Sequence, residues 1–491
     1  HYCCREILKD IEYSNHKKNI IEDKMINNII KYIKLLSDYS KPSDLLFIAV
    51  DGPAPKAKMI QQRQRRFKKF YEKREINNLK AKHNIEIENK EEWDTNAITP
   101  GTVFMNKLNN KLRSEIPKIF ENLNIIISDS NIPGEGEHKL LDHLRKNKSD
   151  DNISVIYGLD ADLIMLCMVS KIDNILLLRE TVEFDNKIHV KGYKFLYLEI
   201  DKLKKNLINE IQIRINRSHL SKNEQNNLID DYIFLSFILG NDFIPHSPCI
   251  GIKNGGIDLM FDIYTRHLDE LKSRNLGLME DSLLNDYILK RNKKKKPNKI
   301  YESEYDRDLD LFNLYPQFNR EIEIKINQGG LNWRQRYYYN LFNMKEQYEI
   351  DKICHYYLEG IFWNFNYYNF NDLYNYMNKL IFNINKIDIP KGKTFKPFEQ
   401  LLMVLPQQSS NLLPYSYKKL MTDINSDIIE YYPDEYIIDC VNNNYLWECS
   451  PILPFIITEN VKKSTENIKL SSEEKDRNKI AKIFIKKKLS N

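Results

Sequence analysis

The sequence has few of the residues that mark non-globular chains. Only 15 glycines and 17 prolines occur among 491 residues, which argues against collagen-like or low-complexity structure. The seven cysteines are odd in number and form no C-x-x-C pair, so neither a disulfide framework nor a structural zinc site is indicated. This cysteine usage fits a reducing, intracellular compartment and does not choose between cytoplasm and nucleus.

Long apolar runs and a strong net charge are also missing. Apolar runs such as residues 163–169 are far shorter than the roughly 20 residues that cross a bilayer, so we expect no membrane-bound role. The 74 Lys and Arg residues exceed the 69 Asp and Glu residues by only 5, too few to identify a nucleic-acid-binding protein. Hydrophobic residues make up 42% of the chain, which predicts a globular protein with a large core.

The first 270 residues or so alternate short apolar runs with amphipathic stretches, a pattern typical of α/β proteins. The predicted strands are residues 44–50, 125–128, 153–157 and 175–178. A looser segment follows, with a basic run at residues 291–297 for which a solvated loop is favoured over a nuclear signal. We therefore expect three parts: an α/β core (1–274), a variable connection (275–328) and an aromatic-rich helical region (329–491).

Carboxylates recur directly after the predicted strands or beside glycines. The six that stand out are Asp51, Glu135, Glu137, Asp160, Asp162 and Asp242. Any one of them alone is more simply a solvated turn former or helix cap. Together they form an oxygen-rich ligand set suited to Mg²⁺ or Mn²⁺, and six carboxylates suggest two ions. Two such ions can assist an in-line displacement at phosphorus, which predicts phosphodiester hydrolysis.

A strongly basic stretch begins a few residues after Asp51. Residues 56–74 contain nine basic residues and one acidic residue, a local charge of +8. On a helix, four side chains would share one face and could grip a phosphate: Lys58, Gln62, Arg65 and Arg66. A generic solvated basic face is the plain alternative, which the nearness of Asp51 makes less favourable.

At this point the residues resemble the XRN family of 5′-to-3′ exoribonucleases, which are relatives of the flap endonucleases. The matching segments, in family order, are 49–59 (AVDGPAPKAKM), 61–67 (QQRQRRF), 96–102 (NAITPGT), 133–139 (PGEGEHK), 157–163 (YGLDADL), 177–180 (LLRE), 240–245 (GNDFIP), 395–401 (FKPFEQL), 404–406 (VLP) and 472–478 (SEEKDRN). They span nearly the whole chain.

The resemblance implies a fold and an activity. The fold would be a 5′-nuclease core of the PIN or flap-endonuclease type with a mainly parallel twisted sheet, wrapped by a helical second conserved region. The enzyme would release nucleoside 5′-monophosphates processively from single-stranded RNA bearing a 5′-monophosphate. The six carboxylates would bind the metal ions, the four residues of the basic stretch would bind the 5′-phosphate, and His1 would stack on a base. Protein partners are not indicated.

Two departures from the family pattern stand out. The family's opening strand carries a metal-binding aspartate six residues before the stacking histidine, and here the sequence starts at that histidine, His1, so we expect the record to be incomplete at this end. The family also supplies a stacking tryptophan from an aromatic stretch that differs here after residue 370. Trp363 is better explained by packing, and Tyr374 or Tyr376 could replace the missing tryptophan.

Two other functions stay open at this stage. A structure-selective flap endonuclease acting on DNA is the first, because residues 248–256 faintly resemble a duplex-binding turn. A catalytically inactive RNA-binding scaffold is the second, if the N-terminal aspartate is truly lost. The basic stretch and the second conserved region favour the exoribonuclease over the former, and the intact carboxylates favour it over the latter.

Overall fold

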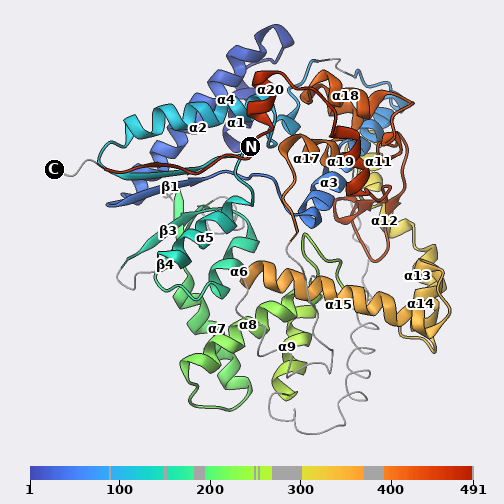
Figure 1. Cartoon of the computed structure of the whole chain (residues 1–491). Helices are drawn as coiled ribbons and strands as arrows, with labels where there is room; N and C mark the ends of the chain where they lie inside the picture. The colour runs from blue at the N-terminus through green and yellow to red at the C-terminus, as the bar shows by residue number, and fades with distance from the viewer. Residues whose placement is uncertain are drawn as a thin grey trace. The chain divides into compact units, whose positions relative to one another are not determined.

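The computed structural model describes most of the chain and divides it into two compact units (Figure 1). The described residues are 1–87, 90–147, 152–181, 194–247, 250–252, 255–267, 301–369 and 392–488. Unit 1 comprises residues 1–142, 301–317 and 392–491, and unit 2 comprises residues 143–300 and 318–391. Each unit is described by itself below.

Unit 1 is built from helices around a small sheet. Its N-terminal elements are α1 (Tyr2–Asp10), η1 (Asn15–Lys17), α2 (Lys18–Ser40), β1 (Leu45–Ala49), α3 (Lys56–Lys82), η2 (Thr95–Ala97), α4 (Val103–Ile119), β2 (Asn124–Ser128) and the start of α5 (Gly136–Lys146). Its later elements are α11 (Glu304–Asn313), α12 (Tyr315–Phe318, whose last residue falls in unit 2), α17 (Pro397–Val404), η5 (Gln407–Leu412), α18 (Tyr415–Thr422), η6 (Ile429–Tyr431), β6 (Ile438–Asp439), η7 (Leu446–Glu448), β7 (Ser450–Pro451), α19 (Thr458–Thr465), α20 (Ser472–Arg477) and β8 (Phe484–Lys486).

The sheet of unit 1 has the strand order β1-β2-β8. Strand β1 pairs in parallel with β2, from Leu45 opposite Asn124 to Ala49 opposite Ser128. Strand β8 adds to the other edge of β2 in the antiparallel direction. Buried isoleucines of β2 pack against α2 and α4 in one hydrophobic cluster. Both β1 and β2 therefore end at the same edge, where ligands are commonly bound in parallel sheets.

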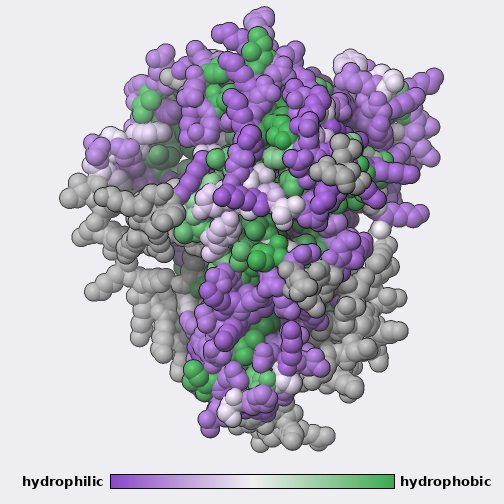
Figure 2. Space-filling view, turned by 90° about the vertical axis from the view of Figure 1, so that its left-hand side faces the viewer, coloured by the Kyte–Doolittle hydropathy of each residue, from purple (hydrophilic) through white to green (hydrophobic). Residues whose placement is uncertain are grey.

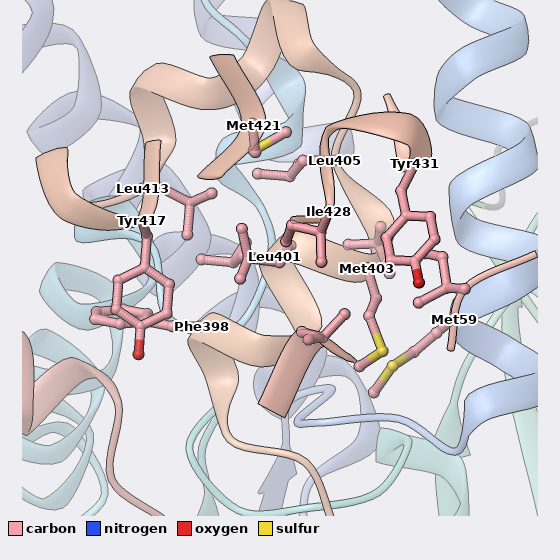
Figure 3. Close-up of a cluster of buried hydrophobic side chains, with 14 of the residues drawn as sticks. Met59, Phe398, Leu401, Met403, Leu405, Leu413, Tyr417, Met421, Ile428 and Tyr431 are labelled. Carbon is pink, nitrogen blue, oxygen red and sulfur yellow. The ribbon is translucent and has the colours of Figure 1, made fainter. Parts of the chain in front are cut away.

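A second hydrophobic cluster joins the N-terminal and C-terminal segments of unit 1 (Figure 3). Met59 on α3 points toward Met403 on α17, and both side chains are at most 3% exposed. Hydrogen bonds continue this contact, because the Gln400 side-chain oxygen accepts from the Ala54 amide at 2.9 Å. The segment around α17 thus holds the loop between β1 and α3 in place.

Unit 2 also combines a small sheet with helices. Its elements are β3 (Ser154–Tyr157), α6 (Ala161–Val169), β4 (Ile175–Glu180), β5 (Phe195–Glu199), α7 (Ile200–Arg214), α8 (Lys222–Ile238), α9 (Gly256–His267), α13 (Glu321–Ile326), α14 (Trp333–Phe342) and α15 (Gln347–Asn369). Strand β3 pairs in parallel with β4, and β4 pairs antiparallel with β5. Helix α8 starts with a capping box in which Ser221 and Glu224 satisfy each other's backbone amides.

The four predicted strands are confirmed as β1, β2, β3 and β4, within one or two residues at their ends. Their assembly differs from the prediction of a mainly parallel sheet. The described strands form two three-stranded mixed sheets, each with one parallel and one antiparallel pair, and a two-stranded hairpin. The chain is a mixed α/β protein in which helices predominate.

In the coloured part of the face drawn in Figure 2, polar side chains predominate and hydrophobic residues occupy smaller areas. Among the helices in the described ranges, none has the length and apolar composition needed to cross a membrane.

Candidate active site

Asp51 lies just beyond the C-terminal end of β1, at the end of the unit 1 sheet where β1 and β2 both finish. The loop that follows is tied to the loop after β2, since the Gly52 amide donates to the Gly134 carbonyl and the Gly134 amide donates to the Pro53 carbonyl, both at 2.9 Å. The Gly136 amide, at the first residue of α5, donates to Asp51 Oδ1 at 2.7 Å. The Asp51 carboxylate is therefore held by a helix N-terminus, which favours negative charge.

Two glycines make this arrangement possible. A Cβ at Gly52 would lie 1.7 Å from the Ile132 carbonyl oxygen, and a Cβ at Gly136 would lie 3.1 Å from the Ala49 oxygen and 3.3 Å from Asp51 Oδ1. Glycine is the residue type that allows such close backbone approach. Gly52 thus lets the loop after β1 lie against the loop after β2, and Gly136 lets the start of α5 lie against the end of β1.

Lys139 on α5 holds the backbone just after β1 and β2 through hydrogen bonds. Its ammonium donates to the Val50 carbonyl at 2.6 Å and to the Asp129 carbonyl at 3.2 Å. Burial lowers the pKa of Lys139 to about 8, while the charges of Asp51 and Asp129 oppose that shift. Lys139 had no role in the sequence analysis. A cation in the first turn of a helix is unfavourable because it opposes the helix dipole. The presence of Lys139 at such a position is the sequence signal that could have indicated a role for it.

Glu135 forms an ion pair with Lys58 of α3. The Lys58 ammonium lies 3.0 Å from Glu135 Oε2, and both side chains are less than one fifth exposed. One predicted metal ligand and one predicted phosphate-binding residue therefore neutralise each other here. Glu137 lies in the first turn of α5, where its negative charge suits the helix dipole.

The predicted phosphate-binding face of α3 contains polar atoms that are buried without a partner. Within the described residues, Gln62 Oε1 and Arg66 Nη1 have no hydrogen bond. Arg66 Nη2 donates to Thr99 Oγ1 at 2.9 Å. Burial, and then the charge of Arg65, lower the pKa of Arg66 to about 9. Leaving such groups unpaired costs free energy. A bound anion would accept from Arg66 Nη1, and it would accept from Gln62 only through the NH₂ group of the amide, because Gln62 Oε1 is itself an acceptor.

Arg65 and Arg63 on α3 have opposite environments. The Arg65 side chain is exposed, and it makes no hydrogen bond or ion pair with any described residue. Arg63 is 6% exposed, and its guanidinium donates to the Pro454 carbonyl at 2.7 Å and to the Tyr431 carbonyl. Arg63 therefore anchors α3, while Arg65 is available to a ligand.

The loop containing Thr99 is held by the C-terminal part of unit 1. Asn96 Nδ2 donates to Ser409 Oγ at 2.9 Å, and Arg477 Nε donates to the Gly101 carbonyl at 3.0 Å. The motifs at residues 96–102 and 472–478 thus meet around the residue that binds Arg66. The second conserved region contributes to this site by supporting it.

In unit 2, Asp160 and Asp162 lie at the start of α6. Asp160 is the exposed N-cap residue, and its side chain makes no capping hydrogen bond. Asp162 lies in the first turn of α6. The buried Arg179 guanidinium on β4 donates to the Leu159 carbonyl, immediately before Asp160. Arg179, another residue to which the sequence analysis gave no role, thus fixes the backbone that carries both aspartates.

Asp242 lies in a tight turn after α8. The Asn241 side-chain oxygen accepts from the Phe243 and Ile244 amides, each at 3.0 Å. Gly240 precedes them with φ +87°, a conformation that favours glycine. The half-buried Asp242 side chain is thereby set in a rigid turn.

The predicted base-stacking residues are only partly described. His1 is exposed at the start of α1. Trp363 stacks on Tyr367 at 5.1 Å between ring centroids and meets Phe243 edge-on at 5.4 Å, contacts that suit a packing role. Tyr374, Tyr376 and the basic run at residues 291–297 lie outside the described residues.

The predicted residues are divided between the two units. Asp51, Glu135, Lys58, Gln62 and Arg66 share the strand edge and α3 of unit 1, while Asp160, Asp162 and Asp242 belong to unit 2. Within the part of the chain that the structure describes, no three His, Cys, Asp or Glu side chains gather as a metal-ion site. The metal-ligand set stays a prediction.

Carboxylates at strand ends beside a cationic helix are typical of α/β proteins that handle phosphate esters. Comparison with known families agrees with this class. The family described as "XRN 5'-3' exonuclease N-terminus" matches residues 1–181, and the one described as "Xrn1 helical domain" matches residues 222–296 and 317–490. The chain belongs to the XRN family.

Several curated proteins are similar over most of the chain. The 5'-3' exoribonuclease 1 of Schizosaccharomyces pombe is 28% identical over 89% of this chain and 43% of its own length. The human 5'-3' exoribonuclease 1 is 30% identical over 97% of this chain and 32% of its own length. The 5'-3' exoribonuclease 2 of Gallus gallus is 28% identical over 94% of this chain and 64% of its own length. The chain thus spans less than two thirds of each of these relatives.

Proposed function

We propose that this protein is a 5′-to-3′ exoribonuclease that hydrolyses single-stranded RNA with a 5′-monophosphate to nucleoside 5′-monophosphates. The observation that carries the proposal is the α3 face on which Gln62 Oε1 and Arg66 Nη1 are buried without hydrogen-bond partners in the described residues. A terminal phosphate would accept from Arg66 Nη1, and from the Gln62 amide once that amide has turned to present its NH₂ group. The relatives named 5'-3' exoribonuclease support the same reading.

The four residues of the α3 face would divide the work of holding the phosphate. The guanidinium groups of Arg65 and Arg66 each offer donors in a fixed fork that suits phosphate oxygens. The Gln62 amide offers a donor after half a turn about its terminal torsion. The Lys58 ammonium, paired with Glu135 in this structure, becomes available to the phosphate once Glu135 has another cationic partner.

The donor set fits divalent cations. Asp51, Glu135, Glu137, Asp160, Asp162 and Asp242 all supply carboxylate oxygens, the ligands that Mg²⁺ and Mn²⁺ prefer. In unit 1, Asp51 Oδ1 is already oriented by the Gly136 amide, so the carboxylate is held before any cation arrives. When bound, a pair of such cations stabilises the charge that develops in an in-line displacement at phosphorus.

The remaining parts of the proposal concern fold and substrate. We place the nuclease core of the PIN or flap-endonuclease type in residues 1–274, with the second conserved region in residues 329–491 and a variable connection between them. Single strands are favoured as substrates because their unstacked bases can stack on aromatic or imidazole rings, and the exposed His1 ring is one candidate.

The experiment follows product size from a single-stranded RNA labelled along its length, with Mg²⁺ and the full-length protein. We expect mononucleotides from the first time point, no intermediate fragments and no reaction in EDTA. Asp160→Ala should abolish hydrolysis and leave RNA binding, measured by fluorescence anisotropy, unchanged. The matched control is Asp173→Ala, which removes a surface carboxylate of unit 2 that pairs with Lys222.

Three outcomes would overturn the proposal. Internal fragments from RNA would identify an endonuclease. Cleavage of flapped DNA without RNA digestion would favour the flap endonuclease. Tight RNA binding without hydrolysis in any divalent cation would favour the scaffold.

A further inference from the structure

A short hairpin near the C-terminus of unit 1 contains two cysteines in positions that face each other. Strands β6 and β7 pair antiparallel, with Ile438 opposite Pro451 and Asp439 opposite Ser450. One more step along this register places Cys440 opposite Cys449. The two residues therefore close the base of the loop formed by residues 441–448.

The hydrogen-bond pattern shows which kind of pair this is. The Ile452 amide donates to the Ile437 carbonyl at 2.8 Å, so that pair is hydrogen-bonded. Hydrogen-bonded and non-hydrogen-bonded pairs alternate along antiparallel strands, and Cys440 and Cys449 fall at a non-hydrogen-bonded position. Cα atoms at such positions are about 4.5 Å apart, which is within the range of about 4.4–6.8 Å that a disulfide requires.

Both thiols are enclosed by apolar side chains. Cys440 is 4% exposed and Cys449 is 1% exposed. Cys440 Sγ donates to the Ile438 carbonyl and Cys449 Sγ donates to the Tyr445 carbonyl, both at 3.5 Å. The neighbouring Cys440 side chain, followed by burial, raises the pKa of Cys449. Ile438 and Leu446 complete the buried cluster, against which Tyr71 of α3 and Phe312 of α11 pack. Neither cysteine is in a disulfide bond in this structure.

We propose that Cys440 and Cys449 are a dithiol that hydrogen peroxide converts into an intramolecular disulfide across the hairpin. In the first step one thiol releases its proton, the thiolate attacks a peroxide oxygen and the O–O bond breaks. A sulfenic acid and hydroxide result, and the hydroxide takes up the released proton to form water. In the second step the other thiol attacks the sulfenic sulfur, the S–S bond forms, and a second water leaves. Two thiols and one peroxide thus give one disulfide and two waters.

The other cysteines in the described ranges lack this arrangement. Cys3 and Cys4 are consecutive in α1, Cys167 is buried in α6, and Cys354 is exposed on α15. The register that places two thiols opposite each other belongs to the β6–β7 hairpin.

The disulfide would stiffen a segment that holds α3. The Lys68 ammonium on α3 donates to the Trp447 carbonyl at 2.7 Å and to the Cys449 carbonyl at 2.8 Å. Oxidation would close the loop of residues 441–448 between Cys440 and Cys449, which includes Trp447, and reduce its freedom in the unfolded state. The expected consequence is a protein that melts at a higher temperature, whatever its enzymatic activity.

The test uses the full-length protein with Cys354→Ser, which removes the thiol that is exposed among the described cysteines. The protein is treated with hydrogen peroxide at pH 7 and pH 9, alkylated under denaturing conditions, digested and analysed by mass spectrometry. We expect a peptide pair joined through Cys440 and Cys449, lacking the two thiol hydrogens and separated by dithiothreitol. It should form faster at pH 9, because the thiolate is the attacking species.

Thermal melting gives a second readout. The midpoint should rise by several degrees on oxidation and return on reduction, while Cys440→Ala and Cys449→Ala proteins should show no such rise. Full alkylation of both cysteines after peroxide treatment would contradict the proposal. So would oxidation of one of them to a sulfinic acid without cross-linking. The mass measurement needs neither alanine variant, so it decides the question even if those variants fold poorly.

Discussion

In both units, a cationic side chain donates a hydrogen bond to the backbone carbonyl immediately before an aspartate that follows a strand. In unit 1, Lys139 donates to the carbonyl of Val50, the residue before Asp51. In unit 2, Arg179 donates to the carbonyl of Leu159, the residue before Asp160. In both units a cation from a neighbouring element donates to the backbone carbonyl next to the aspartate.

The two edges differ in how the carboxylates themselves are treated. Asp51 accepts a hydrogen bond from the Gly136 amide, whereas the exposed Asp160 makes no capping hydrogen bond at the start of α6. Unit 1 therefore orients its aspartate twice, through the backbone and through the side chain. Unit 2 orients Asp160 through the backbone, so Asp160 should depend more strongly on its supporting cation.

Removing the two supporting cations gives the largest expected effect. Lys139→Met and Arg179→Met should each lower RNA hydrolysis by about 10- to 100-fold, as loss of groups that orient metal ligands commonly does. The Arg179→Met effect should be the larger. The Mg²⁺ concentration for half-maximal rate should rise in both, which a purely structural defect would not cause.

Surface variants supply the matched controls for this comparison. Lys34→Met and Arg214→Met remove cations of surface ion pairs in units 1 and 2. Both should leave the rate and the Mg²⁺ requirement unchanged. An unchanged Mg²⁺ requirement in Lys139→Met and Arg179→Met would show that these cations stabilise the fold without orienting the aspartates.

Arg63 and Arg65 of α3 have different expected roles: Arg63 anchors the helix, and Arg65 binds the phosphate. Arg63→Ala should lower the free energy of unfolding by about 2 kcal/mol, because the carbonyls of buried Tyr431 and of Pro454 lose their donor. Arg65→Ala should change it by less than about 0.5 kcal/mol, since the side chain is exposed. Chemical denaturation measures both.

Arg65→Ala should instead remove the preference for monophosphorylated RNA, measured as the ratio of rates on RNA with a 5′-monophosphate and a 5′-hydroxyl. A variant that kept this preference would show that the α3 face is not the phosphate site. A large loss of stability in Arg65→Ala would contradict the division of roles between the two arginines.

The smallest effect concerns a buried acid on α8 of unit 2. Burial raises the pKa of Asp230 from 3.8 to about 6, opposed by Lys171, whose ammonium is 3.8 Å away. The folded state therefore holds this proton more tightly than the unfolded state, and the contribution of Asp230 to stability falls as pH rises from about 4 to 6.

The Asp230→Asn variant lacks this titration. The difference in unfolding free energy between variant and wild type should shift by more than about 1 kcal/mol, in favour of the variant, between pH 4 and pH 7.5. Denaturation at the two pH values measures the shift, and a constant offset between the proteins does not affect it. A difference independent of pH would show that Asp230 titrates normally.

Much of the fold and part of the site could be predicted because their signals are local. The strands β1 to β4 were visible as short apolar runs, and Asp51 and Asp160 as the carboxylates that follow them. The antiparallel partner of β2 cannot be predicted from the sequence in this way, because β8 has only three residues and lies more than 350 residues after β2. Pairing at that separation depends on tertiary packing, which a local pattern does not contain.

The supporting contacts were missed for the same reason. Lys139 and Arg179 lie inside motifs that were recognised, yet their roles depend on carbonyls of other strands. The ion pair between Lys58 and Glu135 joins two residues that were assigned to different sites. The residues that would bind phosphate and metal ions could be predicted from their types and spacing. The side chains that hold those residues in position could be identified only from the structure.

The central claim is that the α3 face binds the 5′-monophosphate of the RNA. The most direct test is single-turnover digestion of three matched single-stranded RNAs with Mg²⁺ and the full-length protein. The RNAs differ only in carrying a 5′-monophosphate, a 5′-triphosphate or a 5′-hydroxyl. We predict rapid release of mononucleotides from the monophosphorylated RNA and slow reaction of the other two. Equal rates on all three RNAs would contradict the claim.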